Sequence, residues 1–311
     1  MKSFASVAVA LATALVFGLA PAANAQKPVT GTHVMELTKE YLAVAPKRYI
    51  GSPGHLAAEH FIHDHFKPEA AKGNYMDDTF TARTPQGFMT MHNLLVKFPS
   101  TNPAKRDNVI VLASHYETNY WLKDINFMGA NDGACTSALL IALGEYFRDH
   151  PPTGDSVWLL FTDGEESINS QWSDSDSLYG TRHIAAKWSG DGTLPHIKAF
   201  VLADMIGWKD MNVTRETNST PWLEDLLAKA AKDTGHSNYV FRESMAVDDD
   251  HIPFKQRGVP VLDVIDYKYG TASDPEAFHH TAQDTMDKLS VQSLQVSADL
   301  FLGVIKLINE H

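Results

Sequence analysis

The sequence predicts an α/β fold: a three-layer α/β/α sandwich with a mixed, mostly parallel central sheet. Apolar, β-branched runs alternate with helical patterns, and such alternation is typical of parallel strands covered by helices on both faces. The chain is about 44% hydrophobic and 21% charged, which is the composition of a globular protein. No repeat or long linker divides it after the first 25 residues, so we expect one domain.

The first 25 residues predict a secretory signal peptide. Lys2 supplies a positive start, and the apolar run at 7–20 is short for a membrane span. Ala23, Asn24 and Ala25 form a small-residue cleavage site. We therefore expect a domain over 26–311 that is secreted or periplasmic, with an uncleaved anchor as the alternative. No later stretch is expected to enter a membrane.

Five apolar runs predict strands, and six periodic segments predict helices. The strands are expected at 89–98, 108–112, 157–161, 200–202 and 259–265. The helices are expected at 35–45, 55–66, 136–148, 179–188, 221–234 and 290–309. The segment 89–98 is longer than the others, which favours an edge or antiparallel strand. Pro260 is tolerated near a strand start, where a missing N–H costs little.

Charge and cysteine content restrict the partners. The whole chain has a formal net charge of −12, which argues against nucleic acid and anionic membranes as partners. Small or cationic peptides are compatible with that charge. The single cysteine, Cys135, excludes an intrachain disulfide. We expect a monomer.

Polar side chains follow the ends of the predicted strands, where parallel sheets place their sites. They are His115, Asp132, Glu165, Glu166, Asp204 and His280. Asp132 alone also fits a turn or helix cap, and His280 alone also fits a surface histidine. Asp204 follows an apolar strand, so its buried charge needs a partner or a metal.

Glu165 and Glu166 are adjacent carboxylates at a strand end. Consecutive side chains of an extended segment diverge, so one can bind a cation while the other faces a substrate. Carboxylate oxygens and imidazole nitrogens are zinc ligands, and catalytic zinc keeps one position open. Asp132, Glu166 and His280 would supply three ligands and leave that position free.

Several motifs resemble the animal-type glutaminyl cyclases, or glutaminyl-peptide cyclotransferases, within the zinc aminopeptidase superfamily. The resemblance runs from about Lys47 to the C-terminus. Two blocks separate the cyclases from the related aminopeptidases: Asp-Ser-Leu-Tyr-Gly at 176–180 and Asp-Asp-His-Ile-Pro-Phe at 249–254. Further matches lie at 48–54, 84–87, 114–116, 129–132, 163–166, 257–262 and 280–281.

The resemblance implies a single zinc-dependent catalytic domain that binds peptide or protein N-termini. It would convert the N-terminal glutamine of peptides to pyroglutamate and release ammonia. It implies one zinc ion per chain on Asp132, Glu166 and His280. Glu165 takes the acid/base role. The resemblance further places a carboxylate pair near the substrate amine and substrate contacts on the pocket wall; these residues are Asp204, Asp249, Trp172 and His279.

The sequence departs from this family at four points. His279 stands where the animal enzymes have tryptophan, Asn119 where they have lysine, and Asp248 where they have glutamine. The family's disulfide near the metal loop cannot form with one cysteine. We expect the three substitutions to alter the pocket wall. The missing aromatic face could come from Tyr267, Tyr269 or Phe278.

Two rival functions are compatible with the same residues. In a two-zinc aminopeptidase, His115 and Asp204 would hold a second zinc, Asp132 would bridge both ions, and water would be the nucleophile. Glu117 stands where aminopeptidases usually have aspartate behind that histidine, which favours the cyclase. The second rival is a zinc-dependent binding protein that has lost catalysis. The intact Glu165 argues against it.

Overall fold

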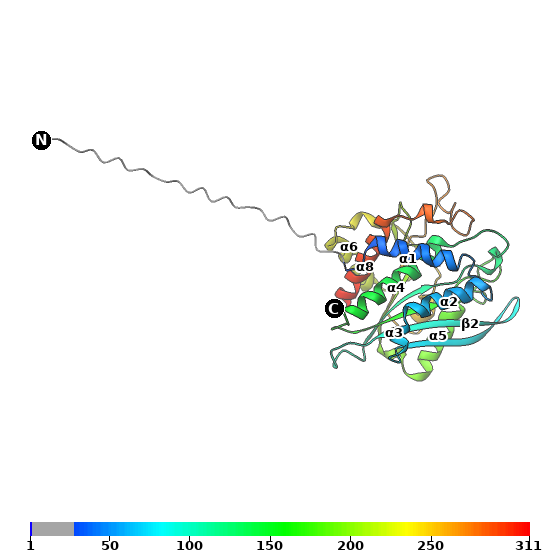
Figure 1. Ribbon diagram of the computed structural model, residues 1–311, viewed down its shortest axis with the longest axis horizontal. Helices are drawn as coiled ribbons and strands as arrows, with labels where there is room; N and C mark the ends of the chain where they lie inside the picture. Colours follow the sequence, from blue (N-terminus) through cyan, green and yellow to red (C-terminus); the bar gives the residue numbers. More distant parts are fainter. Residues whose placement is uncertain (2–27) are drawn as a thin grey trace.

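The computed structural model describes residue 1 and residues 28–311 (Figure 1). Residues 2–25 of the expected signal peptide lie outside the described residues, so that expectation stays a prediction. From residue 28 onward the chain forms a central sheet covered by helices on both faces. The predicted three-layer α/β/α architecture is therefore confirmed.

The central sheet has six strands in the order β1-β2-β4-β3-β5-β8. Their bounds are β1 Tyr75–Thr84, β2 Gly87–Phe98, β3 Val109–His115, β4 Ser156–Thr162, β5 Ile197–Asp204 and β8 Val261–Ile265. Strands β4, β3, β5 and β8 pair in parallel, whereas β1 and β2 pair antiparallel. The four parallel strands consequently end at one edge of the sheet, and that edge carries the site.

The helices form two layers. Their bounds are α1 Gly31–Val44, α2 Pro53–His65, α3 Lys67–Ala70, α4 Cys135–Asp149, α5 Tyr179–Asp191, α6 Pro221–Asp233, α7 Ile252–Lys255 and α8 Val291–Glu310. Helices α1, α2, α4, α6 and α8 share one apolar core with the sheet (Figure 1). Helices α5 and α7 pack on the other face through Ile184, Trp188 and Phe254. All six predicted helices are present.

The predicted strands are also present, and the antiparallel alternative for 89–98 is confirmed. Strand β2 is antiparallel as expected, but it is not an edge strand because β1 pairs along its outer side. Three strands were not predicted: β1, β6 Val213–Glu216 and β7 Val240–Met245. Strand β1 carries polar residues and is half exposed, β7 is largely exposed, and β6 has four residues. None of them contains the continuous apolar run of a buried strand.

Helix α8 corrects the expectation that no later stretch is apolar enough for a membrane. By length and composition it could cross one, but 67% of its most apolar window is buried inside the protein. Leu294, Leu300 and Phe301 on this helix belong to the main core. A buried core helix satisfies the same criterion as a membrane span, because both exclude water from most of their surface.

Candidate active site

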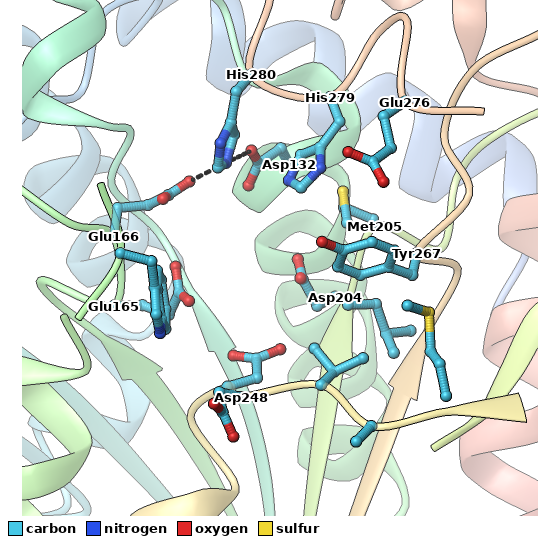
Figure 2. A pocket seen from close by; sticks show the side chains of 16 residues that line it. Asp132, Glu165, Glu166, Asp204, Met205, Asp248, Tyr267, Glu276, His279 and His280 are labelled. Atoms are coloured by element: carbon cyan, nitrogen blue, oxygen red, sulfur yellow. Dashed lines mark hydrogen bonds and ion pairs between the residues drawn. The ribbon is translucent and has the colours of Figure 1, made fainter. Parts of the chain in front are cut away.

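The carboxyl ends of the parallel strands open onto a cavity of about 500 Å³ (Figure 2). Strand β3 ends at His115 and β5 ends at Asp204, while β4 ends just before the segment that carries Glu165 and Glu166. The lining includes Asp132, Glu165, Glu166, Trp172, Asp204, Asp248, Asp249, Tyr267, Glu276, His279 and His280. Every predicted site residue except His115 lines this cavity, and His115 lies directly behind Asp132.

The three predicted metal ligands meet at His280 (Figure 2). Nε2 of His280 lies 3.0 Å from Oε1 of Glu166 and 3.4 Å from Oδ2 of Asp132. Two donor atoms on a tetrahedral zinc ion lie about 3.3 Å apart, given ligand distances of about 2.0–2.1 Å. Oδ2 of Asp132 is buried without a hydrogen-bond partner among the described residues. The donor set and its spacing fit zinc.

Asp132 also faces a second histidine. Its Oδ1 lies 3.1 Å from Nε2 of His115, which in turn lies 3.3 Å from Oδ1 of Asp204. His115, Asp132 and Asp204 are all buried, and their ligand atoms lie within 4.8 Å of one another. His279 offers a further nitrogen within 4.8 Å of Asp132 and His280. The carboxylate of Asp132 thus lies between two groups that could each hold a cation.

A kinked turn presents Asp132. The backbone leaves helical geometry at Asp132 and Gly133, where φ is +86° at Gly133. A Cβ atom at Gly133 would lie 2.9 Å from Cε1 of His115, so the close approach requires glycine. The buried carboxylate of Asp284 accepts hydrogen bonds from the backbone N–H groups of Asn131 and Asp132, at 2.8 and 3.2 Å. The hydroxyl of Tyr269 donates to the same carboxylate.

Arg48 holds the outer side of this turn. Its guanidinium is fully buried and donates hydrogen bonds to five backbone carbonyls instead of a carboxylate. The acceptors are the carbonyls of Ala45, Tyr116, Met128, Gly129 and Asp132. One side chain therefore ties the end of α1, the segment after β3 and the Asp132 turn together. The planar fork of arginine suits this task because it presents five donors in fixed directions.

Glu165 and Glu166 diverge as their extended positions predict. The backbone N–H of Glu166 donates to Oε1 of Glu117 at 3.1 Å, and Glu166 reaches toward His280. Glu165 also lines the cavity, but it is not paired with His280. Burial raises the pKa of Glu165 well above its usual range, and repulsion from Glu166 and Asp249 raises it further. A raised pKa favours the protonated form of Glu165, and a carboxylic acid that faces the cavity can donate a proton there.

Two further carboxylates face the cavity opposite Glu166. Burial raises the pKa of Asp204 and raises that of Asp249 well above its usual range, with their mutual repulsion adding to the effect in Asp249. The segment of Asp249 is anchored by its neighbour Asp250, which accepts hydrogen bonds from the hydroxyls of Thr162 and Thr181 at 2.5 Å each. Thr162 ends β4, so the sheet itself positions Asp249.

The model for peptidase family M28 matches residues 93–305. The chain belongs to peptidase family M28. Its curated relatives include a glutaminyl-peptide cyclotransferase of Boiga irregularis, which is 31% identical over 85% of this chain and 78% of the relative. Another is the glutaminyl-peptide cyclotransferase of Bos taurus, which is 29% identical over 88% of this chain and 82% of the relative. The resemblance to the glutaminyl cyclases is thereby confirmed.

This M28 chain is also similar to solved structures of glutaminyl cyclases. A glutaminyl cyclase from an Acidobacteriales bacterium superposes with a TM-score of 0.88, at 61% identity over 94% of this chain and 98% of that one. A zinc-dependent exopeptidase from Parabacteroides distasonis has a TM-score of 0.76 at 19% identity over 91% of this chain and 99% of that one. The second likeness shows the fold alone.

Two residues predicted to contact the substrate, Trp172 and His279, line the cavity of this M28 protein. Trp172 lines the cavity with 38% of its surface exposed, and His279 stacks edge-to-face with Tyr267 at 5.7 Å between ring centroids. Burial, with the neighbouring His280 adding to it, lowers the pKa of His279 to about 4. Tyr269 and Phe278 are buried against one another and do not line the cavity, so Tyr267 alone of the three supplies an aromatic face.

Asn119 lies deeper than the expected pocket wall. Its amide nitrogen donates to Oε2 of Glu166 and lies 3.3 Å from Nε2 of His280. It therefore contacts two candidate zinc ligands and does not line the cavity. Asp248 and His279 do line it, as expected. At this depth the neutral amide of Asn119 stands where the animal-type cyclases have lysine.

Three supporting residues escaped sequence reasoning: Arg48, Asp250 and Asp284. Each acts on backbone or hydroxyl groups that lie far away in the sequence, so no local spacing reveals it. Arg48 and Asp250 do lie inside motifs that match the cyclases. Asp284 follows His280 by four residues, and only its burial shows that it is more than a turn residue.

His55 forms the ion pair that anchors the segment before Glu165. Nε2 of His55 lies 2.9 Å from Oδ1 of Asp163, and both side chains are buried. Burial works against the charged imidazole, but the carboxylate of Asp163 more than offsets it and raises the pKa of His55 from 6.5 to about 9. The pair therefore stabilises the fold fully below pH 6.5, and this contribution is lost as the pH rises through 9.

Replacing His55 by glutamine is expected to lower the free energy of unfolding by about 3 kcal/mol at pH 6, because Asp163 loses its buried cation. The deficit should shrink as the pH rises through 9, as measured by urea unfolding across that range. His60→Gln, at an exposed position of the same helix, is the matched control. A deficit that does not change with pH would contradict the charged pair.

Proposed function

We propose that this protein is a zinc-dependent glutaminyl-peptide cyclotransferase that converts the N-terminal glutamine of peptides to pyroglutamate. Asp132, Glu166 and His280 hold one zinc ion per chain. The observation that carries the proposal is the position of Glu165, a buried carboxyl group that faces the cavity beside these ligands. The curated relatives and the Acidobacteriales structure, which are named as cyclases, support it.

The reaction is an intramolecular aminolysis. The α-amine of the substrate attacks its own side-chain amide carbon, a C–N bond forms within a five-membered ring, and the bond to the departing nitrogen breaks. The tether between nucleophile and carbonyl removes most of the entropic cost of bringing them together. Zinc, when bound, supplies Lewis-acid polarisation of the amide oxygen.

Glu165 moves the proton in this scheme. As a carboxylate it accepts a proton from the attacking amine, and as a carboxylic acid it returns that proton to the leaving ammonia. Burial and the repulsion from Glu166 and Asp249 favour the protonated form of Glu165, which is the form that returns the proton. The substrate amine must be neutral to attack, and a reference pKa of about 7.7–8.0 for an α-amine permits this.

Asp204 and Asp249 bind the amine in its attacking position. Oδ1 of Asp204 and Oδ2 of Asp249 are buried without hydrogen-bond partners among the described residues, so both can accept from an N–H group. Repulsion between the two carboxylates disfavours their double ionisation, as the raised pKa of Asp249 beside Asp204 indicates. Trp172 and His279 form the walls of the remaining space, which would hold the glutamine side chain.

The second candidate function is a two-zinc aminopeptidase. The contacts of His115 with Asp132 and Asp204, at 3.1 and 3.3 Å, favour it because they would suit a second ion. Against it, Glu117 lies 4.0 Å from Nδ1 of His115, which is too long for the hydrogen bond that usually orients a metal-binding histidine. The cyclase remains the better supported function.

One paired assay tests the two functions. Purified protein is incubated with a Gln-initiated and a Leu-initiated peptide of otherwise identical sequence, and zinc is measured per chain. Ammonia release from the first peptide, with one zinc, is the expected result. Release of free leucine from the second, with two zinc ions, would support the aminopeptidase. Dialysis against a chelator should abolish the activity, and added zinc should restore it.

A further inference from the structure

The cavity that receives the substrate is strongly acidic. Seven of the described residues that line it are aspartate or glutamate, and none is lysine or arginine. Two of these carboxylates, Asp132 and Glu166, would be neutralised by a zinc ion. Three others, Glu165, Asp204 and Asp249, are buried with raised pKa values. The remaining two are Asp248 and Glu276, and both are exposed to solvent.

Asp248 and Glu276 line the cavity from different segments (Figure 2), and because both are exposed they lie where the cavity opens to solvent. Asp248 directly precedes Asp249, which Asp250 anchors to β4. Glu276 precedes His279, whose backbone N–H donates to the carbonyl of Glu276 at 3.2 Å. The two carboxylates are therefore carried by the segments of Asp249 and His279. A peptide that extends out of the cavity would pass close to their negative charges. We call Asp248 and Glu276 the rim carboxylates.

The rim carboxylates have no cationic partner in the part of the chain that the structure describes. Within residues 28–311 neither of them forms an ion pair, and Lys268, which is near Tyr267 in the chain, is paired with Glu243. Deeper in the cavity, Oδ2 of Asp249 is buried and lacks a hydrogen-bond partner among these residues, so it is available to a polar group of a ligand. Charges within about 8–10 Å of one another interact measurably at moderate ionic strength.

We propose that Asp248 and Glu276 make this site select peptides with lysine or arginine directly after the N-terminal residue. The same carboxylates disfavour aspartate or glutamate there. This selectivity rests on the proposed function, because it assumes that a peptide N-terminus enters the cavity. It also gives a role to Asp248, which stands where the animal-type cyclases have a neutral glutamine.

The test compares three peptides, Gln-Lys, Gln-Ala and Gln-Glu, with identical continuations. For the unmodified protein, kcat/KM for Gln-Lys is expected to exceed that for Gln-Glu about tenfold at low salt, and the ratio should approach one in 0.5 M salt. In the double variant Asp248→Asn with Glu276→Gln, the low-salt ratio should fall to about twofold. The thermal midpoint of each variant verifies that it is folded.

A matched double variant separates local from global charge. Asp225→Asn with Glu40→Gln removes the same two charges from exposed positions outside the cavity. It should keep the full tenfold ratio. An equal loss of selectivity in both double variants would overturn the proposal. A low-salt ratio of kcat/KM for Gln-Lys over Gln-Glu near one in the unmodified protein would also overturn it, and so would an unchanged ratio in the rim variant.

A binding measurement distinguishes failure of this proposal from failure of the proposed function. Calorimetry with the pyroglutamyl forms of the Lys and Glu peptides measures the charge preference without turnover. Absence of turnover with a preserved preference in binding would reject the cyclase and keep the selective rim. Turnover of all three peptides at equal rates, with equal binding, would support the cyclase function and reject charge selection by the rim carboxylates.

Discussion

Glu165→Gln is expected to lower kcat for cyclisation of a Gln-initiated peptide by about 10²–10⁴-fold, while the zinc content stays at one ion per chain. Glutamine has nearly the same shape as glutamate but cannot take up the amine proton and pass it to ammonia. Since Glu165 faces the cavity and is not a ligand in the candidate zinc set, the metal should be retained. Stopped assays of ammonia release and elemental analysis measure the two quantities.

The matched control for this variant is Glu276→Gln, the same substitution at an exposed position of the same cavity. It should change kcat much less than Glu165→Gln, because Glu276 lies at the mouth. Full activity of the Glu165 variant would remove the proton-transfer role. Unchanged biological activity without cyclisation would favour the zinc-dependent binding protein.

Arg48→Met is expected to destabilise the protein by about 4 kcal/mol or more. The substitution keeps much of the side-chain volume but leaves five buried backbone carbonyls with fewer donors, and each unsatisfied buried group costs about 1–3 kcal/mol. Arg48→Lys should recover only part of the loss because an ammonium cannot reach all five acceptors. Chemical denaturation of the zinc-bound protein measures the effect.

The control is Arg83→Met, at an exposed position near the end of β1, which should change stability by about 0.5 kcal/mol or less. A loss as small as this in the Arg48 variant would show that the carbonyls find other partners. A folded Arg48 variant should also bind zinc more weakly, because one of the five bonds restrains the carbonyl of Asp132.

The parallel strands and the main helices could be predicted because buried segments leave a strong local pattern. The runs that became β3, β4, β5 and β8 are apolar on both faces, as parallel strands covered by helices must be. Strand β1 has no such run because one of its faces meets water, and its aspartates and threonines obscured it. Its pairing with β2 depends on the hairpin between them and on long-range packing.

The residues of the candidate site could be predicted from the sequence, but the residues that surround and position them could not. Asp132, Glu166 and His280 follow strand ends or match family motifs, so the chain order reveals them. The depth of Asn119 depends on how the segment after β3 folds back over Glu166, which no spacing encodes. Tyr267 faces the cavity whereas Tyr269, two residues later, is buried, and only the three-dimensional path of that loop decides between them.

The single cysteine gives the protein an internal reporter. Cys135 begins α4 directly after the Asp132 turn, is fully buried, and contacts the carbonyl of Asn131 at 3.4 Å. Burial raises the pKa of its thiol well above the usual range, so a thiol reagent in solution can react only when this region opens. Because the sequence holds no other thiol, the rate of thiol labelling would report local opening around Cys135 and the Asp132 turn. A decrease in this labelling rate when zinc is added would measure how strongly the bound ion stabilises the closed form of the Asp132 turn.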